Sequence, residues 1–265
     1  MRVKFASLAA ALAAVAAVAA CAYNPFGEPR ARWRGEAESA CLARGQVRPS
    51  AYVRPMDSIS GRGSCGLEQP FKVSATSRGY VGMEPPATLG CPMTAAVDRW
   101  VAGAVQPAAR RYLGQHVVAI RQMSSYSCRT RESRRRAKLS EHAFGNALDV
   151  AGFRLADGRD ILIARSWWRG RREEQAFLRA VFAAACREFY TVLGPGHNRA
   201  HANHFHLDLL LTNAKNGRHY CRPEPQMSPP EGIPMVEMQG DESVASLPKG
   251  PIPFALKSYD EEEGF

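Results

Sequence analysis

Three features are missing from the 265-residue sequence, and each absence removes a class of protein. No two of the seven cysteines have the CxxC spacing of a zinc ribbon or a thioredoxin motif. No segment after residue 21 has the roughly 20 apolar residues of a membrane-spanning helix. No internal repeat is visible, which excludes a repeat protein. With 45% hydrophobic and 23% charged residues, the composition is that of one globular domain with appendages.

Acidic residues are also absent from the first 21 positions. Arg2 and Lys4 precede a run rich in alanine, valine and leucine that ends at Cys21, which predicts a secretory signal peptide over residues 1–20. The junction Val18-Ala19-Ala20-Cys21 resembles a bacterial lipobox, so we expect Cys21 to be lipidated and to anchor the chain to an envelope membrane. Ordinary cleavage next to an incidental cysteine is the alternative. Either route predicts export, and the first predicts a lipid-anchored periplasmic protein.

Charge is distributed unevenly along the chain. The total is +10, residues 1–21 contribute +2, and residues 222–265 carry nine acids against three bases, a sum of −6. Residues 22–221 therefore carry +14. Such a surface attracts polyanions, among them nucleic acid, an anionic envelope surface and acidic wall polymers. Export argues against nucleic acid as the partner.

Six cysteines remain when Cys21 is set aside. An even number in an exported chain predicts three disulfides, although six cysteines allow fifteen connectivities and the sequence does not choose among them. The six are Cys41, Cys65, Cys91, Cys128, Cys186 and Cys221.

The two ends of the chain differ in composition from its middle. Residues 21–40 are rich in proline, glycine and arginine with no apolar period, which predicts a tether. Residues 222–265 hold eight prolines and an acidic run at 260–263, which predicts a disordered tail. That tail could lie over the basic surface or remain solvated. The predicted folded domain is residues 41–221.

Within that domain, hydrophobic periodicity predicts two helices and several strands. Pro107 should end the first helix, and Asp157-Gly158 should form a hairpin between two strands. The predicted helices are 93–104 and 173–189, and the predicted strands are 116–123, 148–153, 161–163 and 204–211. This order favours an α+β domain in which helices pack on a small antiparallel sheet.

Chemically active residue types gather in two short stretches. In the first, residues 140–150, His142 lies in a loop, Gly145 lets the chain turn closely, and Asp149 enters a strand. Alternation places Asp149 between small alanines on one strand face, which leaves room around its carboxylate.

In the second stretch, residues 201–210, the same alternation places His204, His206 and Asp208 on one face. His201 lies just before them. Isolated histidines are more often structural than functional, and His116, His197 and His219 are read that way. One carboxylate and two neutral imidazoles in a cluster suit Zn²⁺ with a fourth position left for water.

These stretches carry a resemblance to a known group of proteins. The pattern Ser-x-His-x-x-Gly-x-x-x-Asp followed by His-x-His resembles the zinc peptidases grouped with lysostaphin, D-Ala-D-Ala carboxypeptidases and the hedgehog fold. His-x-x-His-x-His is similar to penicillin-insensitive murein endopeptidase. With residues 125–129 and 193–196, the domain resembles the bacterial extensin-like C-terminal domain family. Plant extensins are serine and polyproline repeats, and this chain has none.

The resemblance implies a role for each motif residue. His142, Asp149 and His206 would be the zinc ligands. His204 would be a general base or stabilise the oxyanion, and His201 would be a second histidine near the substrate or water. Arg129 matches an arginine that binds a substrate carboxylate or polarises the carbonyl. Dipeptidases of the group have a glutamate where this chain has Asn203, so any base must be a histidine.

The function implied is metal-assisted hydrolysis of an amide bond in peptidoglycan, by a monomer with Zn²⁺ as its cofactor. A zinc-containing module that binds wall peptide without cutting it is the second hypothesis. A structural wall protein in which zinc and disulfides serve only stability is the third. It predicts no open coordination position and accounts poorly for His201 and His204.

Overall fold

The computed structural model describes residues 30–76, 78–210 and 219–225. Its centre is a nine-stranded sheet in the order β1-β4-β5-β6-β7-β10-β9-β11, with β8 also paired to β7. The strands are β1 (Val53–Pro55), β4 (Phe71–Ala75), β5 (Gly82–Leu89), β6 (Val117–Ser124), β7 (Ala147–Leu155), β8 (Asp160–Leu162), β9 (Thr191–Leu193), β10 (Phe205–Asp208) and β11 (Tyr220–Arg222). A separate pair consists of β2 (Ile59–Ser60) and β3 (Gly66–Leu67).

The mixed α+β class is confirmed, but the prediction of a small antiparallel sheet is wrong. Strands β5 and β6 run parallel, as do β9 and β11. Strand β5 was not predicted from the sequence because the strand contains Pro85 and Pro86, and proline cannot donate a hydrogen bond to a neighbouring strand. Both prolines lie where β5 has no paired residue, between the Gly82 and Ala87 contacts with β4.

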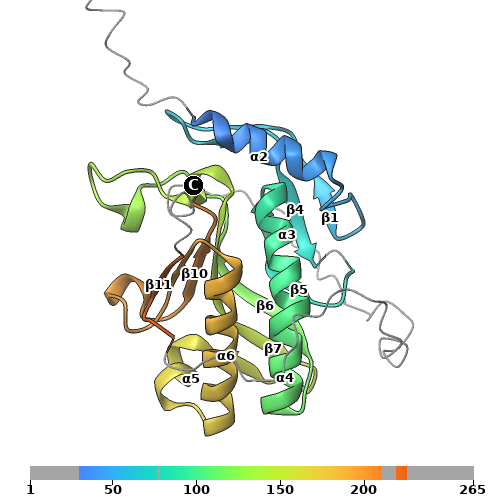
Figure 1. The fold of residues 1–265 in the computed structure, drawn as a ribbon, viewed down its shortest axis with the longest axis vertical. Helices are drawn as coiled ribbons and strands as arrows, with labels where there is room; N and C mark the ends of the chain where they lie inside the picture. The colour runs from blue at the N-terminus through green and yellow to red at the C-terminus, as the bar shows by residue number, and fades with distance from the viewer. Residues whose placement is uncertain (1–29, 77, 211–218, 226–265) are drawn as a thin grey trace, which may run out of the picture.

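Helices cover one face of the sheet, with α3 and α4 beside α6 and with α2 crossing one end (Figure 1). The helices are α2 (Arg32–Ala43), α3 (Cys91–Trp100), α4 (Gln106–Leu113), α5 (Ile163–Arg169) and α6 (Arg172–Glu188). The buried face of α6 agrees with its predicted apolar pattern. Trp100 joins the helices to the sheet, since its ring contacts Phe153 and Phe189 and its Nε1 donates to the Val181 carbonyl at 3.0 Å.

The helix predicted over 93–104 does not end at Pro107. It continues through a π-helical segment, Val101–Val105, into α4. In the π segment the Gln106 N–H donates to the carbonyl five residues earlier, and Pro107 then occupies the first turn of α4. Proline is tolerated there because its missing N–H has no α-helical partner to lose. The hairpin at Asp157-Gly158 is confirmed by the antiparallel β7–β8 pair.

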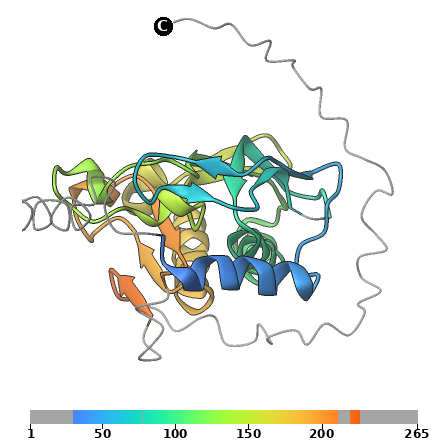
Figure 2. The ribbon, with the colours of Figure 1, turned by 90° about the horizontal axis from the view of Figure 1, so that it is seen from above.

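The predicted tether overlaps a helix, so residues 32–40 are not a tether. Helix α2 buries Arg34, Glu38 and Cys41 at helical spacing. Because two of these three residues are charged, the buried stripe has no apolar period to detect. Figure 2 shows α2 lying alongside the rest of the domain.

Three disulfides join the six cysteines: Cys41–Cys91, Cys65–Cys128 and Cys186–Cys221. The first attaches α2 to the start of α3. The second attaches the β2–β3 pair to the segment after β6, and the third attaches the end of α6 to β11. The prediction of three bridges is confirmed, and their pairing is now assigned.

Other predictions lie outside the described residues, namely the signal peptide at 1–20, Cys21 and residues 226–265 of the tail. Among the residues that are described, no helix has the length and apolar character needed to cross a membrane.

We expect the six paired cysteines to resist alkylation in oxidised protein until a reductant is added. A Cys41→Ser/Cys91→Ser variant should lose about 2–5 kcal/mol of unfolding free energy in urea denaturation, because its unfolded chain is less constrained. Cys21→Ser is the matched control and should unfold like the parent. Several thiols reacting in the oxidised parent would contradict the framework.

Candidate metal centre

The centre is built where β6, β7 and β10 lie next to one another. In the antiparallel β7–β10 pair, Asp149 is the register partner of His206. The alternate residues Leu148, Val150 and Phe205 are fully buried on the opposite, helix-covered side. The alternation that buries the core therefore fixes the carboxylate and the imidazole side by side on the other face.

His142 reaches the same point from a 3-10 turn, η3 (Glu141–Phe144). Ser140 caps the turn by accepting a hydrogen bond from the His142 N–H at 3.4 Å. Gly145 ends it in the left-handed region, with φ of 62°. A Cβ there would lie 2.4 Å from Leu67 Cδ2, so any other residue would need both a strained backbone and a shift of the buried Leu67 side chain. The turn and glycine anticipated from the sequence thus place His142 over β7.

Three ligand atoms converge at this point. His142 Nε2 lies 3.1 Å from Asp149 Oδ1 and 3.2 Å from His206 Nδ1, and His206 Nδ1 lies 2.9 Å from Asp149 Oδ1. All three side chains are buried, at 0, 4 and 8% exposure for His142, Asp149 and His206. These three residues form a group that could hold a metal ion. The family resemblance in the sequence had implied these same three residues as a ligand set.

The donor chemistry fits a cation. His142 Nδ1 lies 2.6 Å from the Ser125 carbonyl, which can only accept, so Nδ1 carries the proton and Nε2 presents a lone pair. His206 Nε2 lies 3.0 Å from Asp208 Oδ2, so a proton there frees Nδ1 as well. Tetrahedral ligands at about 2.0–2.1 Å from zinc lie about 3.3 Å apart, close to the separations observed. Asp208 and the Ser125 carbonyl are the outer partners that orient such ligands.

Without a metal, a proton on His206 supplies the positive charge that stabilises the Asp149 carboxylate. Burial alone would lower the pKa of His206, but hydrogen bonds to Asp149 and Asp208 raise it to about 10. Burial would raise the pKa of Asp149, and hydrogen bonds from His142 and His206 instead hold it well below its usual value. A metal ion would replace that proton as the positive partner of Asp149.

His204 and His201 line the same centre. His204 Nε2 lies 3.5 Å from Asp149 Oδ1, and its Nδ1 lies 2.9 Å from Asn203 Oδ1. His201 Nδ1 lies 2.7 Å from Asn198 Oδ1, and its ring centroid is 5.3 Å from that of His204. Burial lowers the pKa of His204 and, helped by the neighbouring histidines, lowers that of His201 to about 3. Both imidazoles are therefore uncharged at neutral pH.

Arg129 also reaches the centre. Its Nη2 donates to Asp149 Oδ2 at 3.2 Å, and its side chain is 29% exposed. The oxygen of Asp149 that faces the histidines is Oδ1, so the arginine holds the other oxygen. Arg129 thereby fixes the rotation of the carboxylate while part of its guanidinium still faces solvent.

The sequence missed several partners of these residues. Asp208 shares the His206 face, so alternation carried a signal that it was an outer partner. Asn198, which faces Nδ1 of His201, gave no signal, and Asn203, which faces Nδ1 of His204, was noted only as the position where related dipeptidases have a glutamate. His197, read as structural, has its ring 5.5 Å from that of His201. His197 lies in a loop, and loops have no hydrophobic period from which this contact could have been predicted.

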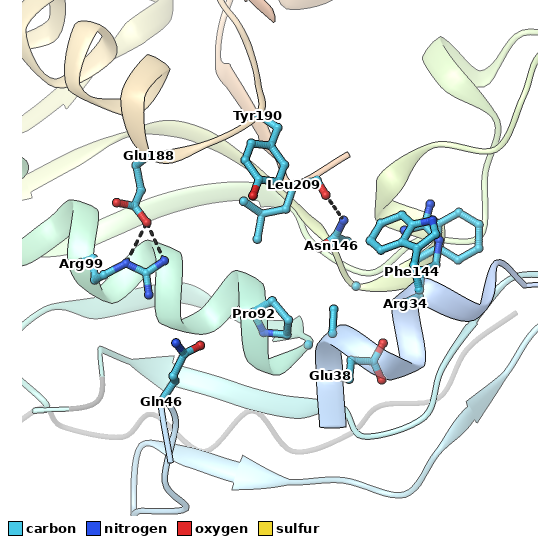
Figure 3. Close-up of a pocket in the computed structure, with 14 residues that line it drawn as sticks. Arg34, Glu38, Gln46, Pro92, Arg99, Phe144, Asn146, Glu188, Tyr190 and Leu209 are labelled. Carbon is cyan, nitrogen blue, oxygen red and sulfur yellow. Dashed lines mark hydrogen bonds and ion pairs between the residues drawn. The ribbon is translucent and has the colours of Figure 1, made fainter. Parts of the chain in front are cut away.

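Helix α2 supports the turn that carries His142. Arg34 forms two hydrogen bonds with Glu141, at 2.6 and 2.7 Å, and its guanidinium lies 3.7 Å from the Phe144 ring centroid. Asn146 donates both to Glu141 and to the Leu209 carbonyl. Figure 3 shows Arg34 beside Phe144, and Asn146 bonded to Leu209, at the edge of a cavity of about 250 Å³ that these residues help to line. None of the three candidate ligands lines that cavity, so it is separate from the metal centre.

We expect Arg34→Met to lower the free energy of unfolding by about 3–5 kcal/mol, because it leaves the Glu141 carboxylate buried without its cation. The double variant Arg34→Met/Glu141→Gln should recover part of the loss. Arg44→Met, at an exposed position at the end of α2, is the control and should change stability little. Equal losses in all three urea titrations would contradict this role for the pair.

Comparison with known proteins adds the family. Residues 39–222 match the family described as Extensin-like protein C-terminus, a span that holds all the centre's residues but begins after Arg34. No curated protein and no solved structure matches the chain. Because the match covers most of the sequence, and includes both motif stretches, the chain belongs to the extensin-like protein C-terminus family.

Proposed function

We propose that the protein is an exported zinc-dependent hydrolase that cuts a peptide bond in peptidoglycan. The observation that carries the proposal is the grouping of three buried ligand atoms with two uncharged histidines beside them. A purely structural metal site does not require uncharged histidines beside its ligands. A hydrolytic site needs such groups, because a base must receive a proton as water attacks.

Zinc is the proposed ion because the donors are two imidazole nitrogens and one carboxylate oxygen. Zinc accepts such mixed sets, and three protein ligands leave a position for water or substrate in catalytic sites. When bound, zinc lowers the pKa of water from about 15.7 to about 7 and polarises the carbonyl under attack.

The chain's own side chains would transfer the proton and bind the substrate. His204 Nε2 bears a lone pair when Nδ1 donates to Asn203, so it can accept the proton of the attacking water and return it to the leaving amine. Arg129 holds Asp149 Oδ2 and can offer its other N–H groups to a carbonyl or carboxylate of the substrate. His201, held by Asn198, borders the space in which the substrate would lie.

The substrate and location rest on the sequence. A signal peptide with a lipobox-like junction, three disulfides and a basic middle favour a lipid-anchored periplasmic protein attracted to an anionic wall. Peptidoglycan supplies peptide bonds in that compartment.

A binding module without activity is the second candidate, and one distance favours it. His204 Nε2 lies 3.5 Å from Asp149 Oδ1, close enough for a small rotation to make His204 a fourth ligand. A metal with four protein ligands would have no position for water and would serve structure or binding.

Metal content tests the ligand assignment. We expect one zinc ion per chain in the parent protein by elemental analysis and none at stoichiometric level in His206→Ala. His116→Ala, at an exposed position far along the sequence from both motifs, is the control and should keep its zinc. Stoichiometric zinc in the His206 variant would show that the assignment is wrong.

Activity separates the two candidates. Purified sacculi digested with the protein should release new muropeptides, and a chelator should stop the release. His204→Ala should keep its zinc but lose turnover by about 10²- to 10⁴-fold, because the proton acceptor is gone. Loss of zinc from that variant would instead make His204 a ligand. Sacculi left intact by the zinc-loaded parent would favour the binding module.

A further inference from the structure

Residues 130–139 form a loop with a pronounced positive charge, which we call the basic loop. It carries five cations, all exposed, and one acid, Glu132. Arg134 is paired with Glu132 at 2.7 Å. Within the described part of the chain, the other four have no side-chain partner. They are Arg131, Arg135, Arg136 and Lys138.

The loop is held in a defined shape. Thr130 and Leu139 form an antiparallel bridge at its base, and the Arg131 N–H donates to the Lys138 carbonyl at 2.9 Å. Thr130 Oγ1 donates to the Arg134 carbonyl at 2.7 Å across the interior. The disulfide at Cys128 fixes the chain just before the loop. The cations are therefore presented on a closed turn.

The backbone of this loop is strained. Across the described residues, the only non-glycine positions with positive φ are Glu132 at 50°, Ser133 at 54° and Arg136 at 62°. All three lie in the basic loop. Left-handed backbone is unfavourable for residues with a Cβ, and such strain concentrates where a function requires the geometry. Crowding like charges on the same ten residues adds repulsion, which an anionic ligand would relieve.

Two contacts attach the loop to the candidate metal centre. On one side, Arg129 directly precedes the loop and holds Asp149. On the other, Glu132 accepts a hydrogen bond from Asn198 Nδ2 at 2.9 Å, and the Asn198 oxygen accepts from the His201 N–H at 3.1 Å. Glu132, whose backbone is left-handed, is thus linked to His201 through one side chain, that of Asn198. In Figure 1 the loop extends as a yellow-green lobe beside β10.

We infer that the basic loop is an anion subsite that binds carboxylate groups of a peptide substrate beside the metal centre. Guanidinium groups match carboxylates in a two-pronged geometry, and three of the four unpaired cations are arginines. Because the loop continues directly from Arg129, the bound carboxylates would belong to the same molecule as the bond to be cut. This inference rests on the proposed hydrolase for its substrate, but its binding test does not require turnover.

The test uses the full-length zinc-loaded protein and fluorescein-labelled tetraglutamate as the probe. In the loop variant, Arg131, Arg135, Arg136 and Lys138 are all changed to glutamine. In the control variant, four exposed arginines remote from the loop, Arg48, Arg54, Arg110 and Arg111, are changed to glutamine, so both variants have the same net charge. Fluorescence polarisation at about 0.02 M and about 0.15 M salt measures binding, with labelled tetraglutamine as the neutral probe.

We expect the loop variant to bind tetraglutamate about tenfold more weakly at low salt, and the control variant to bind within about twofold of the parent. Both variants should retain the parent's zinc content and far-ultraviolet circular dichroism. On sacculi, the loop variant should raise KM with kcat nearly unchanged, since it removes binding and leaves the reacting groups intact.

Equal weakening in both variants would overturn the inference, because net charge alone would then explain binding. The inference would also be overturned if the loop variant lost binding to a short polyphosphate but kept binding to tetraglutamate, since the loop would then prefer phosphate. Specific tetraglutamate binding by a protein that leaves sacculi intact would support the loop as an anion site while the proposed hydrolase failed.

Discussion

The buried carboxylate of Asp149 is the constraint around which the centre is organised. A carboxylate with 4% exposure is strongly destabilising unless positive or hydrogen-bonding groups surround it. Here His142 and His206 contact one oxygen and Arg129 contacts the other. The same set can exchange a proton for a metal ion. The charge of one side chain therefore determines which residues must converge on it from a strand, a turn and a loop.

Rigid supports keep those residues in place. The β7–β10 pair fixes Asp149 opposite His206, while the buried ion pair between α2 and the η3 turn stabilises the segment that presents His142. The Cys65–Cys128 bridge restrains the chain beside Arg129. Sites held by such outer contacts vary little in geometry, which both catalysis and selective binding require. The family name describes no chemistry, and only these donors and their surroundings favour hydrolysis.

Part of the fold could be predicted because its elements have a period. Strands β6 and β7 and helix α6 bury regular apolar faces, and all three appeared within a few residues of their observed bounds. Strands β1, β9 and β11 have three residues each, too few for a period, and β5 contains two prolines. Helix α2 buries charged residues, so its pattern looked like a linker. In β5 and α2, contacts distant in sequence outweighed local preference.

The sequence by itself determined which side chains meet on each strand face, because alternation along a strand is a local property. Alternation placed Asp149 on one face of its strand and His204 and His206 on one face of theirs, the family resemblance added His142, and an even cysteine count predicted three disulfides. Only the tertiary structure decided how the cysteines pair and that α2 supports the turn that carries His142. It alone attached the basic loop to His201 through Glu132 and Asn198. The disulfides, the Arg34–Glu141 pair and the Glu132–Asn198 bond join residues 35 to 107 positions apart, and no local spacing encodes which distant side chain will neutralise or orient another.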